Sequence, residues 1–179
     1  MKAETERIIS LIKAGNQEGF QAAINIYGSR IHAFLLDITG SVPDAEELAN
    51  DTFIKAFTNI HQYNPDKSRF DTWLFSIAHN SAISHLRKFR PQIVDIDSLK
   101  DNLTQSDISE TDLINILQRA IAMLPPDDRA VIHHFYYQKA SLDDISRITG
   151  ISPGNIAVRL HRIRRKLKDL IETINHHDR

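Results

Sequence analysis

The chain has 179 residues, is 41% hydrophobic and carries a net charge of −1, which suits a soluble protein of one or two small domains. It contains no cysteine, which excludes disulfides and cysteine-ligated zinc, and no apolar run approaches the roughly 20 residues needed to cross a bilayer. Because the N-terminus carries acidic residues instead of a basic start followed by an apolar stretch, we expect a cytoplasmic protein.

Charge is distributed unevenly along the chain. Residues 1–90 are neutral overall, residues 91–112 have a net charge of −5, and residues 113–179 have a net charge of +4. The middle block lacks helical periodicity and is rich in Asp, Ser and Asn, so we expect a flexible acidic linker between two domains. Such linkers are usually spacers, although the few apolar residues here leave open an extended segment that docks in a groove.

Helical periodicity dominates residues 1–90, and no alternating β pattern of useful length is present. A short amphipathic helix is interrupted at Gly15, and a longer second helix ends at Gly40. Pro43, followed by acidic residues, opens a third helix. A fourth helix runs from Phe70 into a basic cluster. We therefore expect a helical bundle.

The C-terminal quarter predicts a helix-turn-helix. Ser141 can cap a helix whose first turn holds acidic residues, and Gly150 stands where that helix must end. Ser152 and Pro153 then restart the chain as a second helix, because serine caps the free amides and proline supplies a suitable φ at the first helical position. Two helices joined by a tight turn are typical of a DNA-binding unit.

The second helix of this unit has two faces. Its apolar residues recur at steps of three and four, so they form one stripe that faces a core. The opposite face carries residues that can address base edges or phosphates. These candidate DNA contacts are Asn155, Val158, Arg159, His161, Arg162 and Arg165. For residues 164–168, an ordinary solvated basic helix end is an equal alternative.

Four blocks carry a resemblance to a known family. They are DAEELANDTFIKAF at 44–57, FDTWLFSIAHN at 70–80, LPPDDRAV at 124–131, and the helix-turn-helix. In this order they resemble the extracytoplasmic-function (ECF) sigma factors of the bacterial sigma-70 superfamily. The resemblance implies an all-α chain of two small helical domains. Residues 1–90 would form the region 2 bundle, 91–112 the linker, and 113–179 region 4, a winged-helix-like helix-turn-helix.

The resemblance also assigns a partner to the third helix. In the family, this helix of region 2 binds the clamp of the largest subunit of core RNA polymerase. The matching candidates are Glu47, Asn50, Asp51 and Lys55. Without the resemblance, a polar outer face is what solubility alone demands.

Family members read the −10 element as an opened strand, with one base turned into a pocket. Such a pocket needs an aromatic or apolar wall and an amide that can bond the base edge, roles that match Tyr63 and Asn80. We expect Phe70 and Trp73 to be mainly structural, because an aromatic stripe at helical spacing usually belongs to a core. The candidates for backbone phosphates are Lys67, Arg69, Arg87 and Lys88.

Two features depart from the family pattern. Many relatives place a basic residue in the recognition helix where this chain has Ala157, so the −35 preference can differ. The loop at 61–69 varies within the family, which leaves the base chosen by its pocket open.

We expect no catalytic activity, no cofactor and no metal. The sequence contains no HExxH motif, phosphate-binding glycine loop or nucleophile elbow, and we interpret the nine histidines as helix surface or partly buried core. The partners implied by the resemblance are core RNA polymerase, promoter DNA and an anti-sigma factor. The alternatives are a stand-alone helix-turn-helix regulator with a ligand-binding or dimerising bundle, and a pure interaction protein.

Overall fold

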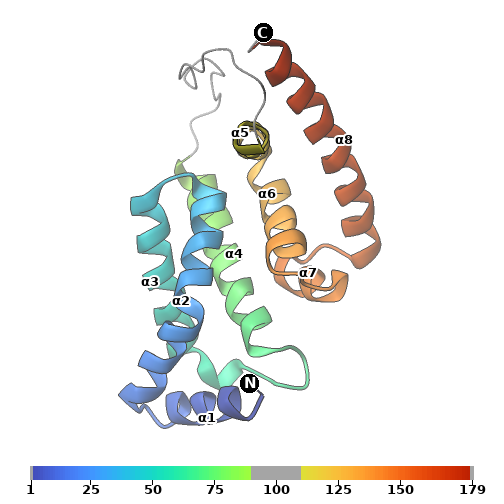
Figure 1. The fold of residues 1–179 in the computed structure, drawn as a ribbon. Coiled ribbons are helices and arrows are strands. Elements are labelled where there is room, and N and C mark those ends of the chain that lie inside the picture. The colour runs from blue at the N-terminus through green and yellow to red at the C-terminus, as the bar shows by residue number, and fades with distance from the viewer. Residues whose placement is uncertain (1, 90–109, 178–179) are drawn as a thin grey trace.

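The structure is a computed structural model that describes residues 2–89 and 110–177. Figure 1 shows two groups of helices. The first comprises α1 (Lys2–Lys13), α2 (Gln17–Thr39), α3 (Val42–Thr58), the 3-10 turn η1 (Ile60–Gln62) and α4 (Phe70–Phe89). The second comprises α5 (Glu110–Ala122), α6 (Pro126–Ile132), the π-helical turn η3 (His133–Tyr137), α7 (Leu142–Thr149) and α8 (Pro153–His177).

The described residues are helical and contain no strand, which confirms the all-α prediction. Most of the predicted linker, residues 91–109, lies outside the described residues. Helix α5 begins at Glu110, three residues before the expected start of the second domain. None of the helices in the described ranges is long and apolar enough to cross a membrane.

Helices α1–α4 pack around one apolar core. Phe34, Leu35, Leu74 and Phe75 are almost completely buried at its centre. Gly40 ends α2 with a left-handed φ of 70°, a conformation that glycine adopts without a Cβ clash. Ser41 then caps α3 by accepting a hydrogen bond from the amide of the third helical residue. The predicted breaks between helices are therefore confirmed.

The helix-turn-helix also forms as its capping and turn residues predict. The Ser141 side chain caps α7, and Gly150 ends it with a φ of 75°. The Ser152 hydroxyl accepts from the Asn155 amide at the start of α8. Ile145 from α7 packs with Ile156 from α8 in a second core, and the far end of α8 packs against α5.

The two groups of helices pack directly against each other. In Figure 1, α4 lies beside α6 and α7. Ala130 from α6 and Ile148 from α7 are buried within the same apolar cluster as the α1–α4 core. We call this contact of α2 and α4 with α6, η3 and α7 the inter-region contact.

Polar interactions also cross the inter-region contact. Arg129 Nη2 donates to the Ile38 carbonyl, at the end of α2, at 2.7 Å. The Thr72 hydroxyl donates to Asp144 Oδ1 at 3.1 Å, and His133 Nδ1 contacts Asp37 Oδ2 at 2.5 Å. The two groups therefore meet through directional polar contacts as well as apolar packing.

Candidate functional site

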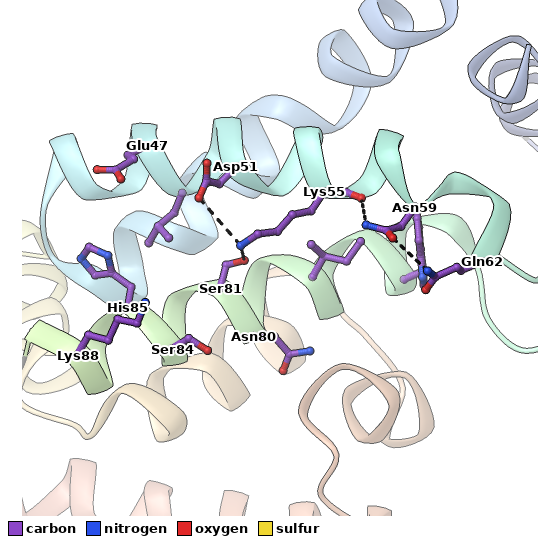
Figure 2. Close-up of a pocket in the computed structure, with 13 residues that line it drawn as sticks. Glu47, Asp51, Lys55, Asn59, Gln62, Asn80, Ser81, Ser84, His85 and Lys88 are labelled. Carbon is purple, nitrogen blue, oxygen red and sulfur yellow. Dashed lines mark hydrogen bonds and ion pairs between the residues drawn. The ribbon is translucent and has the colours of Figure 1, made fainter. Parts of the chain in front are cut away.

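A polar groove of about 680 Å³ runs between α3 and α4. Figure 2 shows its side chains, which come from both helices and from η1. Its lining residues that matter here are Glu47, Asp51, Lys55, Asn59, Gln62, Trp73, Asn80, Ser81 and Lys88. The groove combines charged groups, amides and one aromatic ring, which are groups that can bind a protein surface or a nucleic-acid strand.

Lys55 crosses this groove from α3 to α4. Its Nζ donates to the Ser81 hydroxyl at 3.0 Å and lies 4.0 Å from Asp51 Oδ2 (Figure 2). Asn59 Nδ2 donates to the Lys55 carbonyl at 2.8 Å, and Gln62 Nε2 donates to Asn59 Oδ1 at 3.0 Å. These bonds give the groove a defined polar wall along α3.

The candidate polymerase contacts lie on the solvent side of α3. Glu47, Asp51 and Lys55 line the groove, and Asn50 is exposed on the same helix outside it. The side chains of Asp51 and Lys55 are each about half exposed, at 49% and 51%. All four candidates are therefore accessible to a partner.

The candidate contacts to the −10 element are divided between two places. Asn80 and Lys88 line the α3–α4 groove, and Asn80 leaves α4 on the side away from α3 (Figure 2). Arg87 lines a second cleft, described below. Lys67 and Arg69 are exposed in the loop before α4, where Arg69 pairs with Asp71 at 2.8 Å.

Tyr63, predicted as the wall of a base pocket, is not among the side chains that line this groove. It is only 7% exposed, and its ring packs against Phe70 and Trp73. Its hydroxyl donates to the Ser68 carbonyl at 3.1 Å, and burial raises the pKa of the phenol. Tyr63 thus supports the loop from beneath, and Trp73 is the aromatic side chain that lines the groove.

The expected structural role of Phe70 is confirmed, because this ring is 2% exposed in the core. Trp73 is only partly buried. It packs against the core and also lines the groove.

Helix α8 shows the two predicted faces. Ile156, Leu160 and Ile163 are buried against α6 and α7. Five of the candidate DNA contacts are exposed on the other side: Asn155, Val158, His161, Arg162 and Arg165. These five side chains lie on the face that the apolar periodicity of α8 predicted to point away from the core.

Arg159 is the exception among the α8 candidates. Its Nε donates to Asp128 Oδ1 at 2.6 Å, its Nη2 lies 3.8 Å from Asp127 Oδ2, and its side chain is 21% exposed. These ion pairs join the Arg159 guanidinium of α8 to two carboxylates of α6, so Arg159 acts as a brace between the two helices. Its availability for DNA is therefore much lower than that of Arg162.

Arg159 also lines a second cleft, of about 540 Å³, between α4 and the second group of helices. Asn80, Arg87 and Asp127 line the same cleft, as does His79. Two residues predicted to read different promoter elements, Asn80 and Arg159, thus face one shared space.

Sequence reasoning missed several groups in these sites. Asn59 and Gln62 continue the polar face of α3 beyond Lys55 at steps of four and three, a spacing that could have indicated them. The carboxylates of Asp127 and Asp128 lie far from Arg159 in sequence and carry no such signal. Within residues 2–89 and 110–177, no group of three or more potential metal ligands is present.

The matches to known protein families cover both groups of helices. Sigma-70 region 2 matches residues 23–91, and Sigma-70 region 4 matches residues 114–167. The ECF RNA polymerase sigma factor SigW of Bacillus subtilis is 30% identical, with 95% of this chain and 100% of SigW aligned. SigM of the same organism is 31% identical over 81% of this chain and 90% of SigM.

Solved structures give the same result. The sigma factor RpoE of Bartonella quintana, determined in complex with the anti-sigma factor NepR, matches with a TM-score of 0.67 and 25% identity over 86% of this chain and 96% of RpoE. CnrH, in complex with the cytosolic domain of CnrY, shares the fold with a TM-score of 0.68 at 20% identity, over 93% and 96% of the two chains. Since full-length relatives and both family regions agree with the arrangement of the helices, the chain belongs to the ECF sigma factors of the sigma-70 superfamily.

Proposed function

We propose that this chain binds bacterial core RNA polymerase and directs it to promoters by reading a −35 and a −10 element. The observation that carries the proposal is that two separate accessible surfaces carry the family's candidate residues: the α3–α4 groove and the outer face of α8. The polymerase carries the catalysis in this scheme, and the chain supplies promoter selection. We accordingly assign it to the cytoplasm, where polymerase and DNA meet.

Polymerase binding is assigned to the exposed face of α3. Asp51 and Lys55 form an exposed pair at 4.0 Å, beside Glu47 and Asn50. Exposed charges at the rim of an interface mainly determine the choice of partner and the rate of association. The polar face of α3 therefore suits a protein partner that carries complementary charge.

Recognition of the −10 element is assigned to the region around Asn80. The Asn80 amide offers both a donor and an acceptor, and Trp73 supplies a ring on which a base can stack. We assign the phosphate contacts to four cations, Lys67 and Arg69 in the exposed loop and Arg87 and Lys88 on α4. Tyr63 contributes by holding the loop.

Recognition of the −35 element is assigned to the exposed face of α8. Arg162 can bond guanine or phosphate, Asn155 can bond adenine, and Val158, at 60% exposure, can contact a thymine methyl. His161 and Arg165 extend this face toward the backbone. Arg159 enters the proposal mainly as the brace that holds α8 on α6.

The proposal divides the chain by role. Residues 1–90 bind polymerase and the −10 element, residues 91–112 connect the two parts, and residues 113–179 bind the −35 element. An anti-sigma factor is a further expected partner, because RpoE of Bartonella quintana is bound to one, NepR.

The test is co-elution of the purified chain with core RNA polymerase, followed by promoter-dependent transcription with the resulting complex. Stable co-elution and gained initiation are expected. A folded chain that neither binds core polymerase nor supports initiation would contradict the proposal and favour a stand-alone regulator. The chain alone would then be titrated with operator DNA.

A further inference from the structure

We infer that the inter-region contact is a proton-sensitive latch, with His134 at its centre, which is closed near neutral pH and opens as the pH falls. Opening would separate the two DNA-reading surfaces. This regulatory role builds on the proposed function, but the latch itself is a property of the free chain. It can therefore be tested without polymerase or DNA.

The closed arrangement cannot serve both promoter elements at once. In this arrangement the start of α8 lies close to α4, because Arg159 of α8 and Asn80 of α4 line the same cleft of about 540 Å³. Elements named −35 and −10 are separated by about 25 base pairs, which is roughly 85 Å along B-DNA at 3.4 Å per base pair. The inter-region contact must therefore break before the two regions engage their elements on one promoter.

His134 lies at the centre of this contact. It projects from η3 and is 0% exposed. Its ring packs against Phe34 from α2, with centroids 4.6 Å apart, and edge-on against Phe75 from α4 at 5.6 Å. Both rings belong to the other group of helices, so opening the contact removes the groups that shield His134 from water.

Hydrogen bonding favours the neutral imidazole in the closed state. Nδ1 of His134 lies 3.3 Å from Oε1 of Gln138 and can donate to it, whereas the buried Nε2 has no hydrogen-bond partner. Protonation would place an N–H at Nε2 with nothing to accept it. A buried donor without an acceptor, on a charged ring, is strongly disfavoured.

The groups around His134 add to this effect. His133 on the same turn and His79 on α4 are its titratable neighbours, and Arg30 of α2 lies 5.4 Å from the Phe75 ring. The pKa of His134 is lowered to about 3, chiefly by burial; the Gln138 hydrogen bond acts against burial, and His133 and His79 have smaller lowering effects. Burial also lowers the pKa of His79, whose Nδ1 has no hydrogen-bond partner.

Further charged groups lie at the edge of the contact. Asp37 of α2 contacts His133. For His79, Asp127 of α6 raises the pKa against the effect of burial, whereas Arg159 of α8 lowers it, as burial does. Arg129 of α6 is bonded to the end of α2, and Asp144 of α7 is bonded to Thr72. Of these acids, only Asp37 and Asp127 bear on a histidine, and neither is among the groups that shift the pKa of His134. None of these three carboxylates therefore shifts the pKa of His134.

The direction of the pH effect follows from these environments. In the open chain, a hydrated imidazole has a pKa near 6.5. Since the closed state keeps His134 neutral down to about pH 3, the open state binds the proton first as the pH falls below about 6.5. From pH 7.5 to 5.5, this one group should lower the ratio of closed to open chains about tenfold.

The distance between the two groups of helices is the direct readout. The chain has no cysteine, so Ser29→Cys on α2 and Asp169→Cys on α8 give unique attachment sites for spin labels on exposed positions. Electron–electron distance measurements on the full chain should show a single short population at pH 7.5. A longer population should grow as the pH is lowered to 5.5.

Two variants distinguish protonation of His134 from other effects of low pH on the chain. His134→Leu cannot take up a proton, so the labelled variant should keep most of the short distance at pH 5.5. His61→Leu removes an exposed histidine outside the contact and should open like the parent chain. An unchanged distance in the parent between pH 7.5 and 5.5, or equal opening in His134→Leu, would overturn the latch.

A second measurement does not depend on how His134→Leu packs. The imidazole resonance of His134 can be titrated by NMR in the unmodified chain, and no proton uptake is expected while the short distance persists. A titration midpoint near 6.5 without opening would refute the mechanism. Failure of polymerase binding would instead affect the proposed function and leave the distance result intact.

Discussion

The two faces of the first group of helices differ in chemistry and in accessibility. The outer face, along the α3–α4 groove, carries charged side chains, of which Asp51 and Lys55 are about half exposed. The inner face, against α6, η3 and α7, buries aromatic rings and histidines. A protein partner can therefore reach the outer face while the inter-region contact is closed, whereas full promoter engagement requires that contact to open.

Reversing a charge on the outer face tests this comparison most strongly. Asp51→Lys would place a cation beside Lys55, where a carboxylate now lies 4.0 Å away. We expect affinity for core polymerase to fall by about 30-fold, or about 2 kcal/mol, because like charges at an interface are unfavourable. A titration of labelled chain with core polymerase measures this. Asp169→Lys, an equal reversal on the exposed end of α8, is the control, and undiminished affinity of Asp51→Lys would remove α3 as the polymerase contact.

Two arginines of α8 separate a structural role from DNA recognition. Arg159→Ala leaves Asp128, a side chain 18% exposed, without its cation, so we expect the second group of helices to lose about 2 kcal/mol of stability. Arg162→Ala removes an exposed side chain and should leave stability unchanged while weakening −35 binding by about 1–3 kcal/mol. Thermal unfolding and promoter binding of the holoenzyme separate the two effects. Equal stability of the two variants would contradict the brace.

The helices and their ends were predictable from sequence because their causes are local. Ser141, Gly150 and Ser152 act on amides and carbonyls within a few residues, and the apolar stripe of α8 follows directly from helical spacing. The same reasoning placed Arg159 on the polar face. It could not show that Asp128, 31 residues earlier, would pair with it.

Tertiary packing explains the remaining differences. Tyr63 is aromatic and lies in the expected loop, yet its ring packs against Phe70 and Trp73 and does not line the groove. His133 and His134 are adjacent, and ordinary helical spacing suggests that they face different ways. The π-helical turn and the rings of α2 and α4 bury both, which no local pattern indicated.

Asn80 lies between the two faces, so its removal tests promoter opening with the outer face intact. Asn80→Ala should slow formation of the open promoter complex about tenfold, corresponding to about 1.4 kcal/mol, if its amide bonds one unpaired base. Because the residue is exposed, polymerase affinity and stability should remain unchanged. Permanganate reactivity of unpaired thymines follows opening directly. Asn59→Ala is the matched amide in the groove, and equal defects in both variants would show that the effect is not specific to Asn80.

The smallest expected effect comes from the edge of the inter-region contact. Asp37→Asn keeps a side-chain oxygen near His133 but removes the charge, and Asp37 is 45% exposed, so solvent already screens the pair. We expect the closed state to lose about 1 kcal/mol or less, up to a fivefold shift toward the open chain at pH 7.5. The spin-label pair on α2 and α8 reports the shift, with Asp37→Asn compared with Glu172→Gln, an exposed neutralisation on α8. Because Asp37 lies outside the α3–α4 groove, its loss should favour promoter DNA binding by the free chain by the same factor. A shift in distance without a matching gain in DNA binding would mean that the inter-region contact does not limit access to the promoter.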